Sequence, residues 1–360
     1  MFLALLLIVV LALYINNLSQ KYSFYNLFYS IKFSKSVLEC HEEFEISFII
    51  ENKKILPITY LQINQNYPKE FQFINIDSDV NVFKTTLSIL PYQRIKRSFL
   101  VKCSSRGRYL LYNANLICGD LLGLKQFSRD FEFSREIIVL PKPYDLKNKL
   151  KPIGSFLGDL SVKRWIIEDP ILTVGLREYT GNEPLKYIHW PTSMKNQRLM
   201  VKEFDYTTDN NILLYLNIET SKPFWEKIDS RQIEKVISIT RAIIDKLESE
   251  KIPYGIKCNA QNYMNINLSN TGLGKKHYMS ILESLGRIDY SIFTPFEEIL
   301  KNNRSMNYTT AVVITPSIFN EYVAEINRLK DIYQKVVLIT LEKNNVELMK
   351  NIEIYFEGND

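Results

Sequence analysis

Few residues of this 360-residue chain combine the types and spacing that catalysis needs. A hydrolase requires a nucleophile, a histidine and an orienting acid within reach of one another. The three histidines are His41, His189 and His277, and no G-x-S-x-G or reactive-cysteine context accompanies them. We interpret His189 as structural and predict that the protein is not an enzyme. A hydrolase that uses His189 or Cys258 is the alternative.

The cysteines offer no obvious metal site either. None of the four belongs to a C-x-x-C pair, the usual spacing of structural zinc ligands. We expect scattered, reduced thiols, and a bridge between Cys103 and Cys118 across two strands is the alternative. The sequence also lacks a G-x-x-x-x-G-K-[ST] motif, so any ATP hydrolysis must belong to a partner. The four positions are Cys40, Cys103, Cys118 and Cys258.

The composition is that of a globular protein, with 46% hydrophobic and 24% charged residues. The length suits two domains with an appendage. The net charge of +5 is mildly basic and lacks the concentrated patch of a nucleic-acid binder, so we expect no nucleic-acid partner. Between Lys147 and Lys202, however, ten basic residues face five acidic ones. That excess fits either a solvated face or a surface for a phosphate or acidic partner.

The elements that could position these residues begin with an apolar N-terminal segment. Residues 1–15 are apolar, and the first charged side chain is Lys21. As a helix of about 27 Å, the segment approaches the roughly 30 Å hydrocarbon core of a bilayer. We therefore predict a transmembrane anchor at residues 1–20 that contacts membrane lipid. A signal peptide would need a basic start and a small-x-small cleavage site, and a core helix would need a polar face.

Basic residues then precede the first acid, Glu39. By the positive-inside rule, this places the bulk of the chain in the cytoplasm, as a single-pass protein of the cell membrane. The basic residues are Lys21, Lys32 and Lys35.

A β-rich region follows at about residues 30–142. Apolar residues alternate with polar ones from Glu43 to Ile50, which is typical of a strand with one buried face. Several short strands without a convincing helix predict a β-sandwich. We interpret RGRY at residues 106–109 and GDLLGL at residues 119–124 as turns. The further strands are expected at residues 58–63, 85–90, 95–103, 108–117 and 137–140.

From residue 208 the pattern becomes an alternation of strands and helices. Continuous apolar runs such as residues 211–218 are typical of strands buried on both faces of a parallel sheet. Asp229 and Gln232 form a capping box at the start of a helix. We predict a doubly wound α/β domain over residues 208–360, preceded by a linker at residues 143–207.

The linker carries the most specific pattern of the chain. It reads VGLREYTGNEPLKYIHWPTSMKNQRLMVKEFD over residues 174–205. This resembles the signature of the domain of unknown function 58 family, R-E-Y-x-x-G-D-x-x-R-x-I-x-W followed by L-x-V-[KR]-E. Asn182 and Lys186 depart from it, because the family has Asp and Arg there; a bidentate charge pair is thereby lost. The matching residues are Arg177, Glu178, Tyr179, Gly181, Ile188, Trp190, Leu199, Val201, Lys202 and Glu203.

The resemblance implies a membrane-anchored interaction or assembly factor with a von Willebrand A-like C-terminal domain. It also implies a partnership with a MoxR-type AAA+ ATPase, alongside other membrane or transglutaminase-like proteins, in the maturation of protein complexes or in envelope stress. The signature itself has two interpretations. Arg177 and Glu178 with Lys202 and Glu203, near Tyr179, His189 and Trp190, form either a buried folding latch or an exposed recognition surface.

The resemblance also points to a metal site in degenerate form. Von Willebrand A domains often bind Mg²⁺ through D-x-S-x-S after the first strand, and the equivalent positions here are Asn217, Glu219 and Ser221. Mg²⁺ prefers hard, anionic oxygen ligands. Asn217 replaces the acid and Glu219 the first serine, so we expect no metal and no cofactor. A metal-dependent adhesion protein that faces outward is the alternative.

Overall fold

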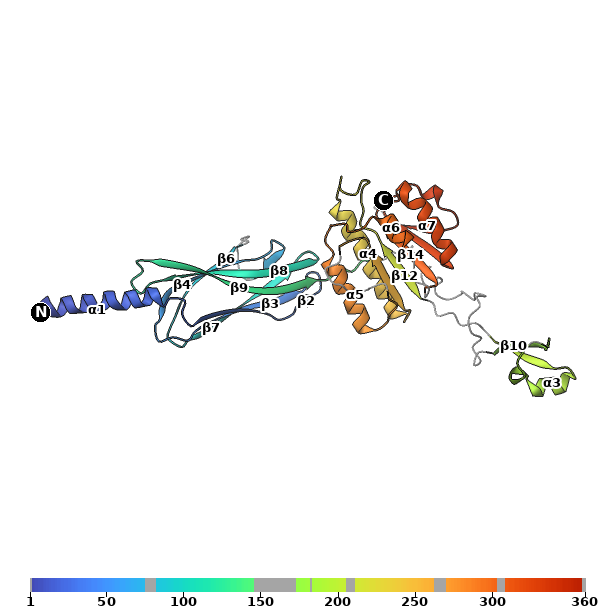
Figure 1. Cartoon of the computed structure of the whole chain (residues 1–360), viewed down its shortest axis with the longest axis horizontal. Helices are drawn as coiled ribbons and strands as arrows, with labels where there is room; N and C mark the ends of the chain where they lie inside the picture. Colours follow the sequence, from blue (N-terminus) through green and yellow to red (C-terminus); the bar gives the residue numbers. More distant parts are fainter. Residues whose placement is uncertain are drawn as a thin grey trace.

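The computed structural model describes most of the chain as four successive parts (Figure 1). These are an N-terminal helix, a β-sandwich, a small unit of two strands and a short helix, and a C-terminal α/β unit. The residues described are 2–74, 82–145, 173–181, 183–204, 211–261, 270–302 and 308–357.

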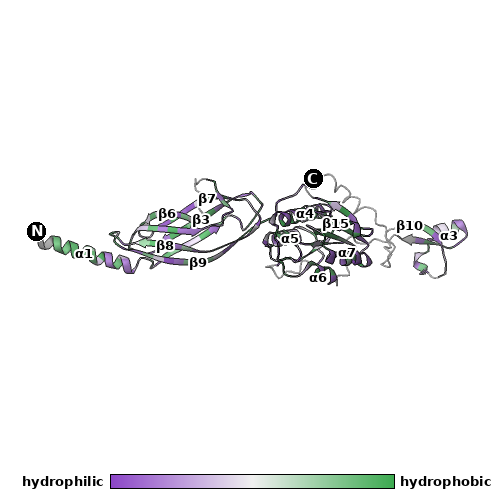
Figure 2. Cartoon of the chain, turned by 90° about the horizontal axis from the view of Figure 1, so that it is seen from above, coloured by the Kyte–Doolittle hydropathy of each residue, from purple (hydrophilic) through white to green (hydrophobic). Residues whose placement is uncertain are grey.

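The N-terminal helix α1 (Phe2–Lys21) has an exposed apolar part and a polar end that packs on the sandwich. Asn16 is buried there, and its side-chain amide donates to the carboxylate of Asp120 over 3.1 Å. Gln20 donates to the same carboxylate over 3.1 Å. The GDLLGL turn, which contains Asp120, therefore binds the polar end of the helix. Figure 2 shows the change from apolar to polar residues along α1.

This docking corrects the predicted anchor. Within the residues that the structure describes, no helix is long and apolar enough to cross a membrane. The prediction of a transmembrane helix at residues 1–20, and the single-pass membrane localisation that depended on it, were wrong. The physical reason is length, because the apolar part before Asn16 measures about 21 Å and falls short of the roughly 30 Å hydrocarbon core.

The β-sandwich consists of a four-stranded and a five-stranded sheet. Its neighbouring strands are antiparallel except for β2 and β9. Aromatic side chains such as Phe48, Phe83 and Phe99 fill the space between the sheets. The strands predicted within residues 43–140 are confirmed. In sheet order they are β1 (Leu27–Phe33), β3 (Glu43–Asn52), β7 (Arg94–Cys103) and β5 (Phe71–Phe73), and then β2 (Val37–Leu38), β9 (Gln126–Val139), β8 (Gly107–Gly119), β4 (Ile58–Asn66) and β6 (Val82–Ile89). Cys103 and Cys118 are free thiols, so the alternative of a disulfide bridge was wrong.

The C-terminal unit is a parallel five-stranded sheet with helices on both faces. Leu214 and Leu216 face α4 and α5, whereas Leu213 and Tyr215 face α6 and α7. Asp229 caps α4 by accepting from the backbone N–H groups of Arg231 and Gln232, as predicted. The predicted capping box is not formed, because the Gln232 side chain donates to Glu342 and the Asp229 N–H donates to Thr220. The sheet order is β13 (Tyr254–Cys258), β12 (Ile212–Leu216), β14 (Thr310–Thr315), β15 (Lys335–Thr340) and β16 (Glu353–Phe356); the helices are α4 (Ser230–Ser249), α5 (Lys275–Arg287), α6 (Phe296–Lys301) and α7 (Asn320–Ile332), with a 3₁₀ turn η3 at Val346–Leu348.

The prediction of a von Willebrand A-like domain was wrong: the described elements form a parallel sheet with helices on both faces, but they do not form a von Willebrand A-like fold. The strands are all parallel and follow the order 2-1-3-4-5 from one edge to the other. Alternating strands and helices predict a parallel sheet, but each crossover can add its strand at either side, so the pattern leaves the order open. The described part of the chain contains more strands than helices, and its α-helices number six.

Candidate functional site

The predicted linker at residues 143–207 contains a folded unit, which we call the signature unit (residues 173–204). Strand β10 (Thr173–Glu178) pairs antiparallel with β11 (Met200–Phe204), so the two halves of the signature lie side by side. The 3₁₀ turn η2 (Leu185–Tyr187) and the short helix α3 (Trp190–Asn196) connect them.

His189 ties this connection together. Its ring Nδ1 lies 2.8 Å from the Thr192 hydroxyl and accepts from the backbone N–H of Thr192, which caps α3. Its backbone N–H donates to Met200 over 2.8 Å, and the Ser193 hydroxyl links α3 to the same residue of β11. These contacts hold the helix against the strand pair and give His189 a positioning role within the unit.

Arg177 and Glu178 of the signature lie at the surface. Arg177 pairs with Glu183 at 2.5 Å, and Glu178 pairs with Arg198 at 2.7 Å between two exposed side chains. Hydrogen bonds from Thr180 and the Arg177 guanidinium lower the pKa of Glu183 to about 2. This arrangement differs from the buried network that a folding latch requires.

The remaining signature positions do not complete such a network. Lys186 lies over the ring of Tyr187 at 4.9 Å, and Lys202 stands opposite Leu176 across the strand pair. Gly181 adopts a positive φ of 97°, which favours glycine. Glu203 is in register with Gly175, and Tyr179 donates its backbone N–H to Leu199. Asn182 lies outside the described residues.

The apolar burial of the signature unit is inverted, in the sense that more of its large apolar side chains are exposed than buried. Ile188 and Val201 are buried. Trp190 is 58% exposed, Met194 80% and Leu185 67%. Because residues four apart share one face of a helix, Trp190 and Met194 project from the same side of α3. The unit thus presents more large apolar side chains to solvent than it buries among its described residues.

The predicted degenerate metal positions lie where strands β12, β13 and β14 end. Asn217 is buried and donates to Thr315 over 3.0 Å, while it accepts from Asn259 over 2.7 Å. Its side-chain oxygen also accepts from the backbone of Glu219. Ser221 faces elsewhere, because its hydroxyl donates to carbonyls of the turn at Pro223 and Lys227.

Glu219 is the centre of this cluster and is fully buried. One carboxylate oxygen accepts from the backbone of Phe296 over 2.8 Å, and the other from the Tyr322 hydroxyl. The Lys222 ammonium lies 2.9 Å from Glu219 and 2.8 Å from Glu297. Burial alone would lower the pKa of Lys222, but the two carboxylates raise it.

Sequence reasoning missed this lysine, which supplies the positive charge that a metal would otherwise bring to Glu219. The oxygens of Asn217 and Ser221 are already bonded to protein groups, so the three positions do not fit a Mg²⁺ ion. Among the described residues, no group of three or more His, Cys, Asp and Glu side chains could hold a metal ion.

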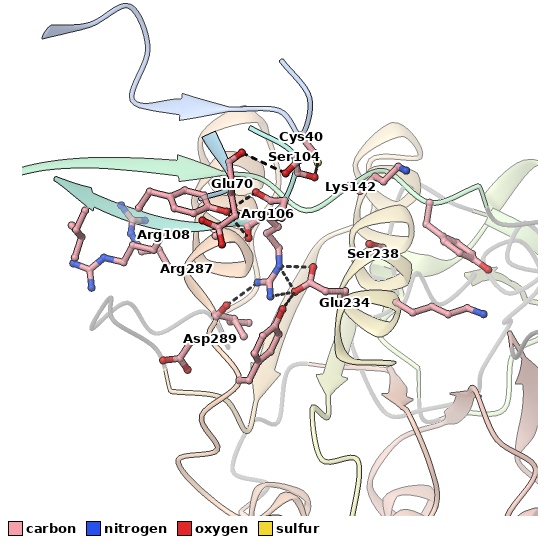
Figure 3. A pocket seen from close by; sticks show the side chains of 18 residues that line it. Cys40, Glu70, Ser104, Arg106, Arg108, Lys142, Glu234, Ser238, Arg287 and Asp289 are labelled. Atoms are coloured by element: carbon pink, nitrogen blue, oxygen red, sulfur yellow. Dashed lines mark hydrogen bonds and ion pairs between the residues drawn. The ribbon is translucent and has the colours of Figure 1, made fainter. Parts of the chain in front are cut away.

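A second polar cluster joins the sandwich to the α/β unit (Figure 3). Arg106, the first residue of the RGRY motif, has a side chain that is only 3% exposed. It forms a bidentate pair with Glu234 of α4, with distances of 2.6 to 3.2 Å. It also donates to the carbonyl of Leu285 within α5 and to that of Ile288, the residue directly after α5. A motif interpreted as a simple turn is therefore the main contact between two domains.

Two further arginines extend this domain junction. Arg241 of α4 pairs with Glu39 at 2.6 Å, and Arg287 of α5 pairs with Glu136 at 3.0 Å. Gly286 allows the close approach, because a Cβ there would lie 2.8 Å from Ile138. A cleft of about 740 Å³ lies beside Arg106 and is lined from both domains. Its arginines are bonded to carboxylates of the junction, which accounts for them structurally.

Comparison with known proteins adds little. No protein-family model matches the chain. The uncharacterized protein YeaD of Bacillus subtilis (strain 168) is 21% identical over 223 residues, or 60% of this chain and 51% of that protein. The chain thus spans about half the length of the curated relative it matches.

The structural likenesses are weak. The CARDB domain of a Pyrococcus furiosus protein has a TM-score of 0.21 and 13% identity, covering 32% of this chain and 87% of that one. A cohesin module from a Clostridium perfringens family 33 glycoside hydrolase has a TM-score of 0.22 and 13% identity, covering 31% and 94%. At these scores the likenesses carry no argument about this protein.

Proposed function

We propose that this protein is a non-enzymatic interaction or assembly factor of the domain of unknown function 58 family, and that the signature unit is its partner-binding element. The partner that the family resemblance implies is a MoxR-type AAA+ ATPase, whose ATP hydrolysis would drive the maturation of protein complexes. The observation that carries the proposal is the inverted apolar burial of the signature unit.

A unit of this size needs an additional source of stability. Domains below about 40 residues rarely bury enough apolar surface to fold without disulfides, metals or association. The two buried residues Ile188 and Val201 supply little core, and each exposed large side chain represents about 1.5–3 kcal/mol of unused burial. A partner that covers Leu185, Trp190 and Met194 would supply the missing burial.

The groups considered for catalysis favour binding over chemistry. Burial raises the pKa of the Cys258 thiol to about 12, so it is protonated near neutral pH and a poor nucleophile. The His277 ring bonds to the backbone carbonyl of Tyr254. His189 caps a helix. Among the residues that the structure describes, none of these three has the nucleophile, base and orienting acid of a hydrolase arranged around it.

The test is a pull-down of the full chain from extract of its own cells. We expect an AAA+ ATPase to be captured by the wild type and lost with Trp190→Ala, because the indole is a typical anchor of a protein interface. Trp225→Ala is the matched control, since Trp225 is 71% exposed on the α/β unit. Capture without any AAA+ ATPase, or equal capture by both variants, would refute the proposed function.

A further inference from the structure

The signature unit combines exposed apolar side chains with an excess of positive charge. It contains five basic and three acidic residues. Basic residues directly adjoin exposed apolar ones in Leu185-Lys186, Met194-Lys195 and Arg198-Leu199. The unit therefore exposes both large apolar side chains and cations, the two kinds of group that the core and the polar border of an interface use.

Two of these cations are available to a partner. Arg177 and Arg198 are engaged by Glu183 and Glu178. Within the part of the chain that the structure describes, neither Lys186 nor Lys195 pairs with a carboxylate. Lys186 stacks over Tyr187, and both lysines are exposed. Each lysine is the sequence neighbour of an exposed apolar residue, Leu185 or Met194.

From this juxtaposition, and on the basis of the proposed function, we propose that the signature unit receives an acidic amphipathic segment of its partner. Apolar side chains of that segment cover Leu185, Trp190 and Met194, and its carboxylates pair with Lys186 and Lys195. Charge selects this occupant over a second copy of the same unit, because two such surfaces would bring their unpaired lysines together. Opposite charges across an interface also steer association and set its dependence on salt.

The experiment measures the binding of a labelled synthetic helix to the full chain by fluorescence anisotropy. The probe carries leucines at helical spacing between glutamates. One comparison peptide replaces every glutamate with lysine, and another scrambles the acidic sequence. We expect the acidic amphipathic peptide to bind, the lysine peptide not to bind, and the scrambled peptide to bind at least about tenfold more weakly, because it loses the apolar stripe.

Variants of the protein separate the apolar and ionic contributions. Trp190→Ala should weaken binding by at least about tenfold, as expected of an aromatic anchor, whereas Trp225→Ala should not. Lys186→Glu with Lys195→Glu should abolish the preference for the acidic peptide and its weakening by salt. Lys350→Glu provides the matched charge control on an exposed loop of the α/β unit.

Three results would overturn the inference: equal binding of the acidic and lysine peptides, equal loss with Trp190→Ala and Trp225→Ala, or self-association of the chain through Trp190. The outcome is separable from that of the proposed function. If the ATPase is captured through Trp190 but the acidic peptide does not bind, the protein is an interaction factor whose partner has a different chemistry. If the peptide binds and no ATPase is captured, the surface is assigned correctly but the implied partner is wrong.

Discussion

The domain junction and the signature unit use the same pair of side chains, arginine and glutamate, to opposite effect. At the junction, Arg106 is removed from water and bonds to Glu234 and to two backbone carbonyls. In the signature unit, Arg198 and Glu178 meet while both remain exposed to solvent. Removing the buried arginine leaves the backbone carbonyls that it bonds unsatisfied, which is costly, whereas an exposed pair contributes little. Whether a charged motif is structural or available for recognition therefore depends on its burial and not on its composition.

The largest expected effect is at the junction. Arg106→Ala removes the guanidinium, leaves the carbonyls of Leu285 and Ile288 without this donor, and leaves Glu234 with the Tyr290 hydroxyl alone. Since each buried carbonyl left unsatisfied costs about 1–3 kcal/mol, we expect a loss of about 3–5 kcal/mol in the free energy of unfolding. Urea denaturation of the full chain measures this. Arg108→Ala is the matched control, since Arg108 is partly exposed in its pair with Glu136 and should cost about 1 kcal/mol or less. Equal losses for the two variants would remove the distinction between the regions.

An intermediate effect is expected at the end of β12. Lys222→Met leaves the buried Glu219 carboxylate without its cation, and charge-assisted hydrogen bonds of this kind are worth about 2–3 kcal/mol. The folded-state pKa of Lys222 is raised above its usual 10.5. The stability it contributes is therefore complete below pH 10.5 and is lost as the pH rises through the higher folded pKa.

The measurement for Lys222 is the difference in unfolding free energy between wild type and variant across this alkaline range. Lys227→Met, at an exposed position of the neighbouring turn, provides the control and should change little. A difference that stayed constant well above the raised pKa, or an equal loss with Lys227→Met, would show that Lys222 is not the counter-charge of Glu219.

The smallest effect is expected in the signature unit itself. Arg198→Ala breaks an exposed pair with Glu178 and should change the free energy of unfolding by less than about 0.5 kcal/mol. Thermal unfolding of the full chain in low and high salt measures it. A loss comparable to that of Arg106→Ala would mean that the signature residues act as a folding latch after all.

Sequence reasoning located strands and helices well where the hydrophobic period was regular. The alternation in β3 and the capping of α4 by Asp229 are both local, and both were predictable. What it missed depends on contacts distant in sequence. Arg106 meets Glu234 across 128 positions, and Lys222 belongs to no recognisable ligand spacing. The strand order of the C-terminal sheet is likewise fixed by tertiary packing, to which no local pattern refers.

The N-terminal helix shows the complementary failure. The apolar run over residues 1–15 and the absence of charge before Lys21 predicted a membrane span. In the structure, Asn16 and Gln20 at the polar end of this helix donate to the carboxylate of Asp120. The signature unit was treated as linker for a similar reason, since its few buried residues leave almost no hydrophobic periodicity to detect.

Strand β8 lies between the two contacts that join the sandwich to its neighbouring parts. It begins next to Arg106, whose side chain bonds to Glu234 of the α/β unit. It ends next to Asp120, whose carboxylate accepts from Asn16 of α1. Thirteen residues in extended conformation cover about 40 Å. A single strand, which is hydrogen-bonded to β4 and β9 on its two sides, thus connects the contact with α1 to the contact with the α/β unit. The helix α1 and the α/β unit are therefore attached at opposite ends of one strand of the sandwich.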